Sequence, residues 1–197
     1  YDWGIYLPNN PCKMIKRSKE PSPRLRVLDD EEYERLLKAC KEVDLIYLEN
    51  AFVFSIETCV RQGELLNARW ENVNFKKQTL FIPDTKTGYL SKESTSERTI
   101  PLSKLAIITL NKLPRHISGR IFPITRDQLN QKWKLAKKKA KIKNYRYHDN
   151  RSTGISWCFE KKNLNVAEVM TISGHRSPTI LLKRYTKLNP TKIAMKI

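Results

Sequence analysis

The chain has 197 residues, and its 38 lysines and arginines against 20 aspartates and glutamates give a formal net charge of +18 at pH 7. The length suits one large domain or one domain with an attached linker, and a hydrophobic content of 40% argues against wholesale disorder. The cationic excess favours a polyanionic partner, with nucleic acid ahead of an anionic membrane surface, and no apolar run approaches the roughly 20 residues that a membrane span requires.

The first segment, residues 1–23, contains several prolines around a charged stretch, and prolines at this density cannot hold a continuous helix. We therefore expect an extended linker here. The chain starts at Tyr1, without a methionine or a signal peptide, which suggests a fragment of something longer.

The globular part is predicted to begin with a helix in LDDEEYERLLKAC, where Asp29 can cap the first turn and Glu32 fits the reciprocal position of a capping box. The next stretch, LENAFVFSIETCV, is apolar nearly all round, which predicts a buried helix. TLFIP and ERTIPL are short strand candidates, separated by TKTG and a Ser/Thr-rich stretch that are typical of turns and loops.

Helices are expected to dominate after Ser103. In TRDQLNQKWKLAKKKAKI, Trp133, Ala136 and Ala140 fall at i, i+3 and i+7, with lysines on the other face. Three more segments of helix length follow, in HDNRSTGISWCFEKK, NVAEVMTIS and PTILLKRYT. Together these patterns predict a mixed, mainly α domain with one small antiparallel sheet.

The four cysteines, Cys12, Cys40, Cys59 and Cys158, are scattered and form no C-x-x-C pair. Neither a zinc site nor a disulfide framework is expected, because both need closely spaced or regularly paired cysteines. The pattern favours buried free thiols in a reducing cytoplasm.

Four short patches carry side chains that could act together. Each patch alone favours an ordinary structural role: a boundary arginine with a helix-capping glutamate, a solvated turn lysine, or polar residues on one helix face. The candidates are Arg61 and Glu64 in RQGEL, Lys86 in TKTG, His148 and Arg151 in HDNR, and His175 and Tyr185 in SGHRSPTILLKRYT.

In this order and at these distances, the four patches resemble the arginine, hairpin-lysine, H-x-x-R and histidine–tyrosine boxes of tyrosine recombinases, in the phage-type integrase branch. The resemblance implies the tyrosine recombinase catalytic domain fold from residue 24 to residue 197, with a C-terminal tail from about residue 188. Residues 1–23 resemble the end of the family's upstream core-binding domain and its linker, on the residues WGIYLPNNP.

The resemblance also implies roles in the cleavage of a DNA phosphodiester. Arg61 and Arg151 would clamp the non-bridging oxygens with forked donors, and Tyr185 would be the nucleophile of a 3′-phosphotyrosine intermediate. Lys86 would protonate the leaving 5′ oxygen, with Lys92 as the alternative donor. No metal and no cofactor are expected.

Three further side chains receive supporting roles by the same resemblance. His148 would be the acid/base partner of the tyrosine hydroxyl, and His175 would donate a hydrogen bond to the phosphate. Glu64, three residues from Arg61 at the end of the buried helix and on the same helical face, would orient the site.

The lysines of KWKLAKKKAKIK can contact DNA phosphates or only raise the local potential on a solvated face, and the sequence leaves both open. The candidates for backbone contacts are Lys134, Lys137, Lys138 and Lys141. The chain departs from the family pattern at Asn150 and Ser152, where altered helix packing is expected. It also has about one extra residue between His175 and Tyr185.

The predicted function is therefore that of a site-specific DNA recombinase, an integrase that integrates or excises a mobile element. The alternatives are a type IB topoisomerase-like enzyme that relaxes DNA and a non-catalytic DNA-binding domain. Expected partners are double-stranded DNA attachment sites, further copies of the chain in a homotetramer on DNA, and DNA-bending accessory proteins, with no membrane. The expected location is the bacterial cytoplasm, in association with the nucleoid.

Overall fold

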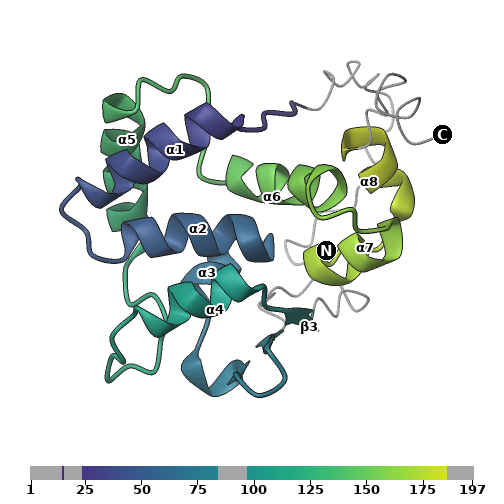
Figure 1. Cartoon of the computed structure of the whole chain (residues 1–197), viewed down its shortest axis with the longest axis horizontal. Coiled ribbons are helices and arrows are strands. Elements are labelled where there is room, and N and C mark those ends of the chain that lie inside the picture. The colour runs from purple at the N-terminus through teal and green to yellow at the C-terminus, as the bar shows by residue number, and fades with distance from the viewer. Residues whose placement is uncertain (1–14, 16–23, 84–96, 186–197) are drawn as a thin grey trace, which may run out of the picture.

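The computed structural model describes residue 15 and residues 24–83 and 97–185. The described part is mainly helical, with one small sheet (Figure 1). The helices are α1 (Asp30–Lys41), α2 (Leu48–Thr58), α3 (Gln62–Asn67), α4 (Lys104–Asn111), α5 (Arg126–Lys139), α6 (Asp149–Glu160), α7 (Val166–Ser173) and α8 (Pro178–Tyr185). A 3₁₀ turn, Trp70–Asn72, leads into strands β1 (Val73–Asn74), β2 (Thr79–Ile82) and β3 (Arg98–Pro101).

The helix starts follow from local side-chain chemistry. Asp29 caps α1, accepting from the N–H of Glu32 at 2.7 Å while the Glu32 carboxylate accepts from the N–H of Asp29, so the predicted capping box is confirmed. The proline at residue 178 begins α8, where a missing N–H costs nothing.

The sheet has the order β1-β2-β3 and is antiparallel throughout. Its inner face carries Leu80 and Ile82 of β2 opposite Ile100 and Arg98 of β3, while Phe81 faces outward. The two strands predicted in TLFIP and ERTIPL are confirmed. The connection between them, residues 84–96, lies outside the described residues, and with it Lys86 and Lys92.

Most of the buried apolar side chains form one cluster, the main core, which α1, α2, α4, α5 and the sheet enclose. Helix α6 runs beside α2 and approaches it closely at Gly154, where an added Cβ would overlap the carbonyl oxygen of Ile56. Buried polar groups cross this contact, because Tyr145 donates to Asn150 at 2.8 Å and Asn150 donates to Ser55 at 3.2 Å. Asn150 is therefore a buried, hydrogen-bonded contact between α6 and α2.

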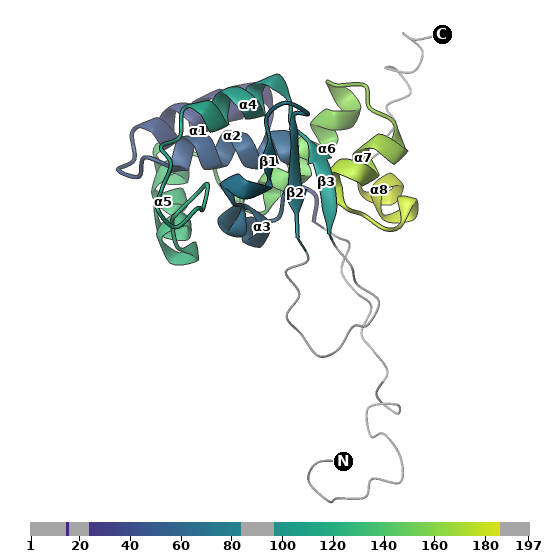
Figure 2. The ribbon, with the colours of Figure 1, turned by 90° about the horizontal axis from the view of Figure 1, so that it is seen from below.

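A second, smaller group of buried side chains joins the end of α2 to α6, α7 and α8; we call it the small cluster. Its members are Cys59, Ile155, Cys158, Val169, Ile172, Leu181 and Tyr185. Figures 1 and 2 place α7 and α8 at one end of the molecule and α5 at the opposite end.

The cysteines within the described residues, Cys40, Cys59 and Cys158, are buried and unbridged, as predicted; Cys12 lies outside them. In the part of the chain that the structure describes, no helix is both long and apolar enough to cross a membrane.

Candidate active site

Arg61 and Glu64 lie at the start of a helix, and their predicted place at the end of the buried helix is wrong. Helix α2 ends at Thr58 because Cys59 takes the left-handed conformation, with φ at 53°. Arg61 is extended and precedes α3, and Glu64 is the third residue of α3. The two are still paired, since the Glu64 carboxylate accepts from the backbone N–H of Arg61 at 2.8 Å and from its Nη1 at 2.7 Å.

Glu64 also pairs with a second arginine, Arg98 of β3. Nη1 of Arg98 donates to Oε1 at 3.0 Å and Nη2 donates to Oε2 at 2.8 Å, and the carboxylate is almost fully buried. Burial alone would raise the pKa of Glu64, but the hydrogen bonds and charge of Arg98, together with those of Arg61, outweigh it and lower the pKa to about 2. Glu64 is therefore an anion at every working pH and is paired with two guanidiniums, those of Arg61 and Arg98.

Arg151, in the first turn of α6, is held by two backbone carbonyls. Its Nη1 donates to Cys59 O at 2.5 Å and its Nη2 to Ser173 O at 2.6 Å, and the residue is 5% exposed. Burial, followed by the nearby charge of Arg61, lowers the pKa of Arg151 to about 10, so the guanidinium stays charged at neutral pH. The ends of α2 and α7 thus orient this cation.

His175 follows directly on the end of α7. Gly174 ends that helix in the left-handed conformation, with φ at 69°, and its N–H bonds to Met170 O at 2.7 Å. The turn places Nδ1 of His175 2.7 Å from the hydroxyl oxygen of Ser173, which is fully buried. The same Ser173 therefore contributes its carbonyl to Arg151 and its hydroxyl to His175.

Tyr185 is the last residue of α8, and its ring meets that of His175 edge-on, with centroids 6.2 Å apart. The side chain packs in the small cluster and is 7% exposed. Ser173 thus links Arg151 to His175, whose ring meets Tyr185, and the paired Arg61 and Glu64 lie close enough for the charge of Arg61 to act on Arg151.

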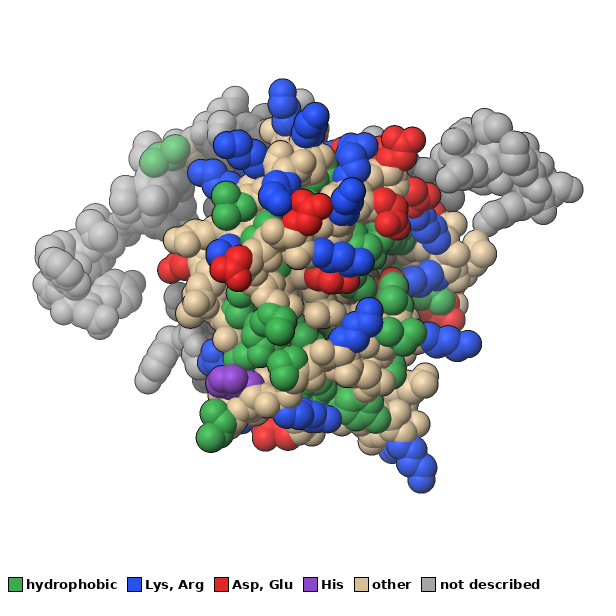
Figure 3. Space-filling view, turned by 60° about the vertical axis from the view of Figure 1, so that its left-hand side comes forward, with side chains coloured by type: hydrophobic (Ala, Val, Ile, Leu, Met, Phe, Trp, Pro, Cys, Tyr) green, Lys and Arg blue, Asp and Glu red, His purple; other side chains and the backbone are tan. Residues whose placement is uncertain are grey.

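The other predicted site residues are mostly exposed or lie outside the described residues. His148 is exposed and precedes α6, one turn before Arg151. Lys86 lies outside the described residues. Of the candidates for backbone contacts in and just after α5, Lys134, Lys138 and Lys141 are exposed and Lys137 is half-buried. Figure 3 views the side of α1 and α5, where cationic and anionic side chains are interspersed.

The sequence profile of the phage integrase family matches residues 26–192, which is most of the chain. The chain belongs to the phage integrase family. The shufflon-specific DNA recombinase of Escherichia coli is 34% identical over 196 residues, which are 100% of this chain and 48% of that protein. A putative integrase/recombinase of Haemophilus influenzae is 32% identical over 199 residues, covering 93% of this chain and 50% of the relative. This family member thus spans about half the length of these relatives.

Solved structures of family members share the fold. The catalytic domain of bacteriophage HP1 integrase superposes with a TM-score of 0.66 at 22% identity, over 88% of this chain and 95% of that one. XerA recombinase gives a TM-score of 0.67 at 19% identity, over 88% of this chain and 65% of that one. The predicted fold, that of tyrosine recombinase catalytic domains, is confirmed.

Sequence reasoning missed Arg98 and Ser173 as parts of this site. ERTIPL was interpreted only as a strand, although alternation along it puts Arg98 on the same face as the buried Ile100. A charge on the inner face of a strand needs a buried counter-charge, and that signal was available. The hydroxyl of Ser173 carries no comparable signal, because its role depends on how α7 ends.

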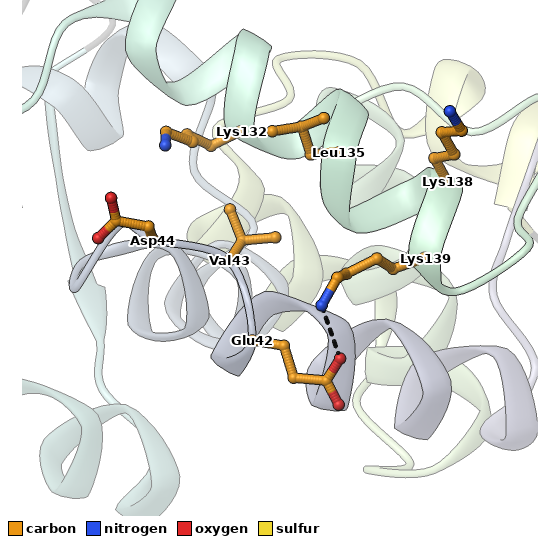
Figure 4. Close-up of a pocket in the computed structure, with 7 residues that line it drawn as sticks. All are labelled: Glu42, Val43, Asp44, Lys132, Leu135, Lys138 and Lys139. Atoms are coloured by element: carbon orange, nitrogen blue, oxygen red, sulfur yellow. Dashed lines mark hydrogen bonds and ion pairs between the residues drawn. The ribbon is translucent and has the colours of Figure 1, made fainter.

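A separate groove of about 460 Å³ lies between the end of α1 and α5 (Figure 4). One of its edges is closed by the ion pair between Lys139 and Glu42, at 3.0 Å. Of the predicted residues only Lys138 lines it, so the groove is distinct from the candidate active site. Within residues 24–83 and 97–185, no three His, Cys, Asp or Glu side chains are grouped as metal ligands.

Proposed function

We propose that this domain is the catalytic part of a site-specific DNA recombinase, which cuts and rejoins DNA strands to integrate or excise a mobile element. The observation that carries the proposal is that Arg151, His175 and Tyr185 are linked around the ends of α2 and α7, with Arg61 near enough for its charge to lower the pKa of Arg151. A tyrosine, a histidine and two arginines at one place match the needs of phosphoryl transfer to a hydroxyl.

In the proposed reaction, Arg61 and Arg151 bind the two non-bridging oxygens of the scissile phosphate. Negative charge accumulates on these oxygens in the transition state, and guanidiniums aimed at them lower the barrier. Arg151 is suited to this because carbonyls from two helix ends fix its plane before the substrate arrives. Arg61 is 43% exposed at its side chain and stays accessible to a ligand while Glu64 holds it.

The Tyr185 hydroxyl oxygen attacks phosphorus, its proton leaves, and the bond from phosphorus to the 5′ oxygen breaks. The product is a 3′-phosphotyrosine and a free 5′ hydroxyl, and attack by a new 5′ hydroxyl reverses the step. Lys86 is proposed to supply the proton of the leaving oxygen. A side chain that is only 7% exposed must leave the small cluster to meet a phosphate, so α8 has to move for cleavage.

The two histidines are proposed to act from opposite sides of the phosphate. His148 takes up the proton of the tyrosine hydroxyl. In the proposed tautomer, Nδ1 of His175 accepts from the Ser173 hydroxyl 2.7 Å away, and the ring proton on Nε2 donates to the phosphate.

The chemistry is proposed to need no metal ion, because the arginine clamp supplies the positive charge that a metal would otherwise provide. Partners are proposed to be double-stranded attachment sites and three further copies of the chain, with DNA-bending proteins as accessories. Lambda integrase has been solved as a tetramer bound to a Holliday junction, with a TM-score of 0.66 to this chain. The proposed location is the bacterial cytoplasm, at the nucleoid.

The test is incubation of the whole protein with a nicked suicide duplex that carries the candidate site, followed by a denaturing gel. We expect a covalent protein–DNA adduct, formed equally in EDTA. Complete absence of adduct would favour a non-catalytic DNA-binding domain, and a strict magnesium requirement would contradict the metal-free step. Resolution of a four-way junction separates the recombinase from an enzyme that only relaxes supercoiled DNA.

A further inference from the structure

Arg98 contacts two parts of the candidate site, α3 and the end of α7, although no catalytic role is proposed for it. Its guanidinium pairs through both outer nitrogens with Glu64, and its Nε donates to Ile172 O at 3.2 Å. Its side chain is 10% exposed. A residue of β3 thereby connects α3 with the last turn of α7.

The contact at α7 is close as well as polar. A Cβ on Gly174 would lie 2.9 Å from Cδ and from Nε of Arg98, so the arginine lies flat against the glycine backbone. Because His175 is the next residue, this close contact lies directly beside the candidate site.

We propose that Arg98 is a positioning residue for strand cleavage, which holds the turn at residues 172–175 against the Arg61–Glu64 pair. This inference rests on the proposed function, since it concerns the same site. One phosphate has to meet Arg61 on one side and Arg151 and His175 on the other. The two sides belong to different chain segments, and Arg98 joins them through one planar group.

The charges around Glu64 support this role. With Arg98 in place, the buried carboxylate of Glu64 pairs with two guanidiniums. Its single negative charge is then divided between Arg61 and Arg98, so the positive charge of Arg61 is only partly neutralised. Without Arg98, Arg61 would be the main partner of the Glu64 carboxylate. The Arg61 guanidinium would be drawn inward, and some acceptor positions of the carboxylate would be left without a hydrogen bond. Loss of Arg98 should therefore harm catalysis through Glu64, and neutralising Glu64 should relieve part of the harm.

The experiment measures single-turnover cleavage of the suicide duplex by the full-length protein, together with its Kd for the uncut site and its melting temperature. For Arg98→Met we expect the cleavage rate at saturating protein to fall about 100-fold, while Kd changes less than about threefold, because misplacement by about an ångström affects the transition state and not the ground state. For Arg98→Lys we expect a loss of about tenfold, since lysine keeps the charge and loses the fork.

Two further variants test whether the loss of cleavage rate arises from the contact between Arg98 and Glu64. The double variant Arg98→Met/Glu64→Gln should cleave at least about fivefold faster than Arg98→Met alone, because the unsatisfied carboxylate is gone. Arg69→Met is the matched control: Arg69 pairs with Glu71 at 2.8 Å on the surface, and its loss should change the rate less than about twofold.

Arg98→Met cleaving within about threefold of wild type would overturn the inference, as would a double variant slower than Arg98→Met. If Arg98→Met does not fold, Arg98→Lys decides: a rate equal to wild type overturns the inference, and a lower rate with unchanged Kd supports it. A wild-type protein that forms no adduct would overturn the proposed function itself, whereas a wild-type adduct with an unimpaired Arg98→Met would remove only the role of Arg98.

Discussion

The main core and the small cluster differ in size and in what they carry. The main core holds α1, α2, α4, α5 and the sheet together with most of the buried apolar side chains. The small cluster joins only the end of α2 to α6, α7 and α8, yet it includes Tyr185 and lies beside His175. The proposed nucleophile is thus placed on the less extensively packed part of the molecule.

The proposed phosphate clamp lies where the two parts meet. Arg61 directly precedes α3, which packs into the main core, while Arg151 donates to Cys59 at the end of α2 and to Ser173 at the end of α7. Arg61 is thus anchored beside the larger core, and Arg151 is fixed at the junction between the two parts. The group that must move to react is anchored to the smaller one, where local opening costs less free energy.

The largest effect should come from removing the reactive atom of the small cluster. Tyr185→Phe keeps the ring and its packing and deletes the hydroxyl, so the covalent adduct should fall at least about 1,000-fold while DNA binding stays within about twofold. A denaturing gel and a gel-shift assay on the same duplex measure the two quantities. An adduct at wild-type yield would move the nucleophile to another residue.

The bridge between the two parts can be tested at Arg151. We expect Arg151→Lys to lose about 100-fold in cleavage rate, close to the loss in Arg151→Ala, because an ammonium cannot reach both carbonyls and both phosphate oxygens as a planar fork does. Single-turnover cleavage measures both variants. Recovery of most of the rate by lysine would mean that charge alone suffices.

Acid should weaken the contact of the sheet with α3. The pKa of Glu64 is about 2 in the folded chain against an ordinary value of 4.5, so its ion pairs contribute about 3 kcal/mol to the free energy of unfolding above pH 4.5. This contribution is lost as the pH falls from about 4.5 to 2. Denaturant unfolding across this range should show a flatter acid limb for Glu64→Gln, whereas Glu71→Gln, at an exposed carboxylate, should follow the wild type. Parallel curves for Glu64→Gln and wild type would contradict the assignment.

The smallest predicted effects are changes in the free energy of unfolding when either of two helical glycines, Gly154 or Gly63, is replaced by alanine. Gly154→Ala should destabilise the protein by about 1–3 kcal/mol, because its Cβ would meet Ile56 O and, at 2.9 Å, the sulfur of Cys59. Gly63→Ala in α3 should stabilise by about 0.5–1 kcal/mol, since its nearest neighbour would be Nη2 of Arg126 at 3.9 Å. Thermal melts of both variants measure the difference, and equal shifts would show that α2 and α6 can separate to make room.

Local chemistry made much of the fold predictable. The capping box at Asp29 and Glu32 involves neighbours in sequence, and the spacing of Trp133 and Ala136 sets the buried face of α5; both predictions are confirmed. The fold of the family followed from four short motifs and is confirmed by the comparison with solved structures.

The features that the sequence did not predict depend on how residues far apart in the chain are placed relative to one another. Arg98 and Glu64 are 34 residues apart, and their pairing requires the sheet register and the position of α3 together. Helix α3 has only six residues, too few for a periodic pattern, and so Arg61 was assigned to the preceding helix. The roles of Lys86 and of the four candidate lysines in and after α5, and the boundary at residues 23 and 24, stay predictions.

The tight approach of α6 to α2 at Gly154 has a consequence for the timescales of the molecule. Amide hydrogens of these two helices should exchange with solvent only when the whole domain unfolds, because neither helix can slide past the other. Amide hydrogens of α8, held by a few side chains, should exchange through a local opening of lower free energy. The exchange map of the DNA-free protein should therefore divide at the small cluster, so that Tyr185 can leave its resting place many times while the Arg151 backbone stays closed.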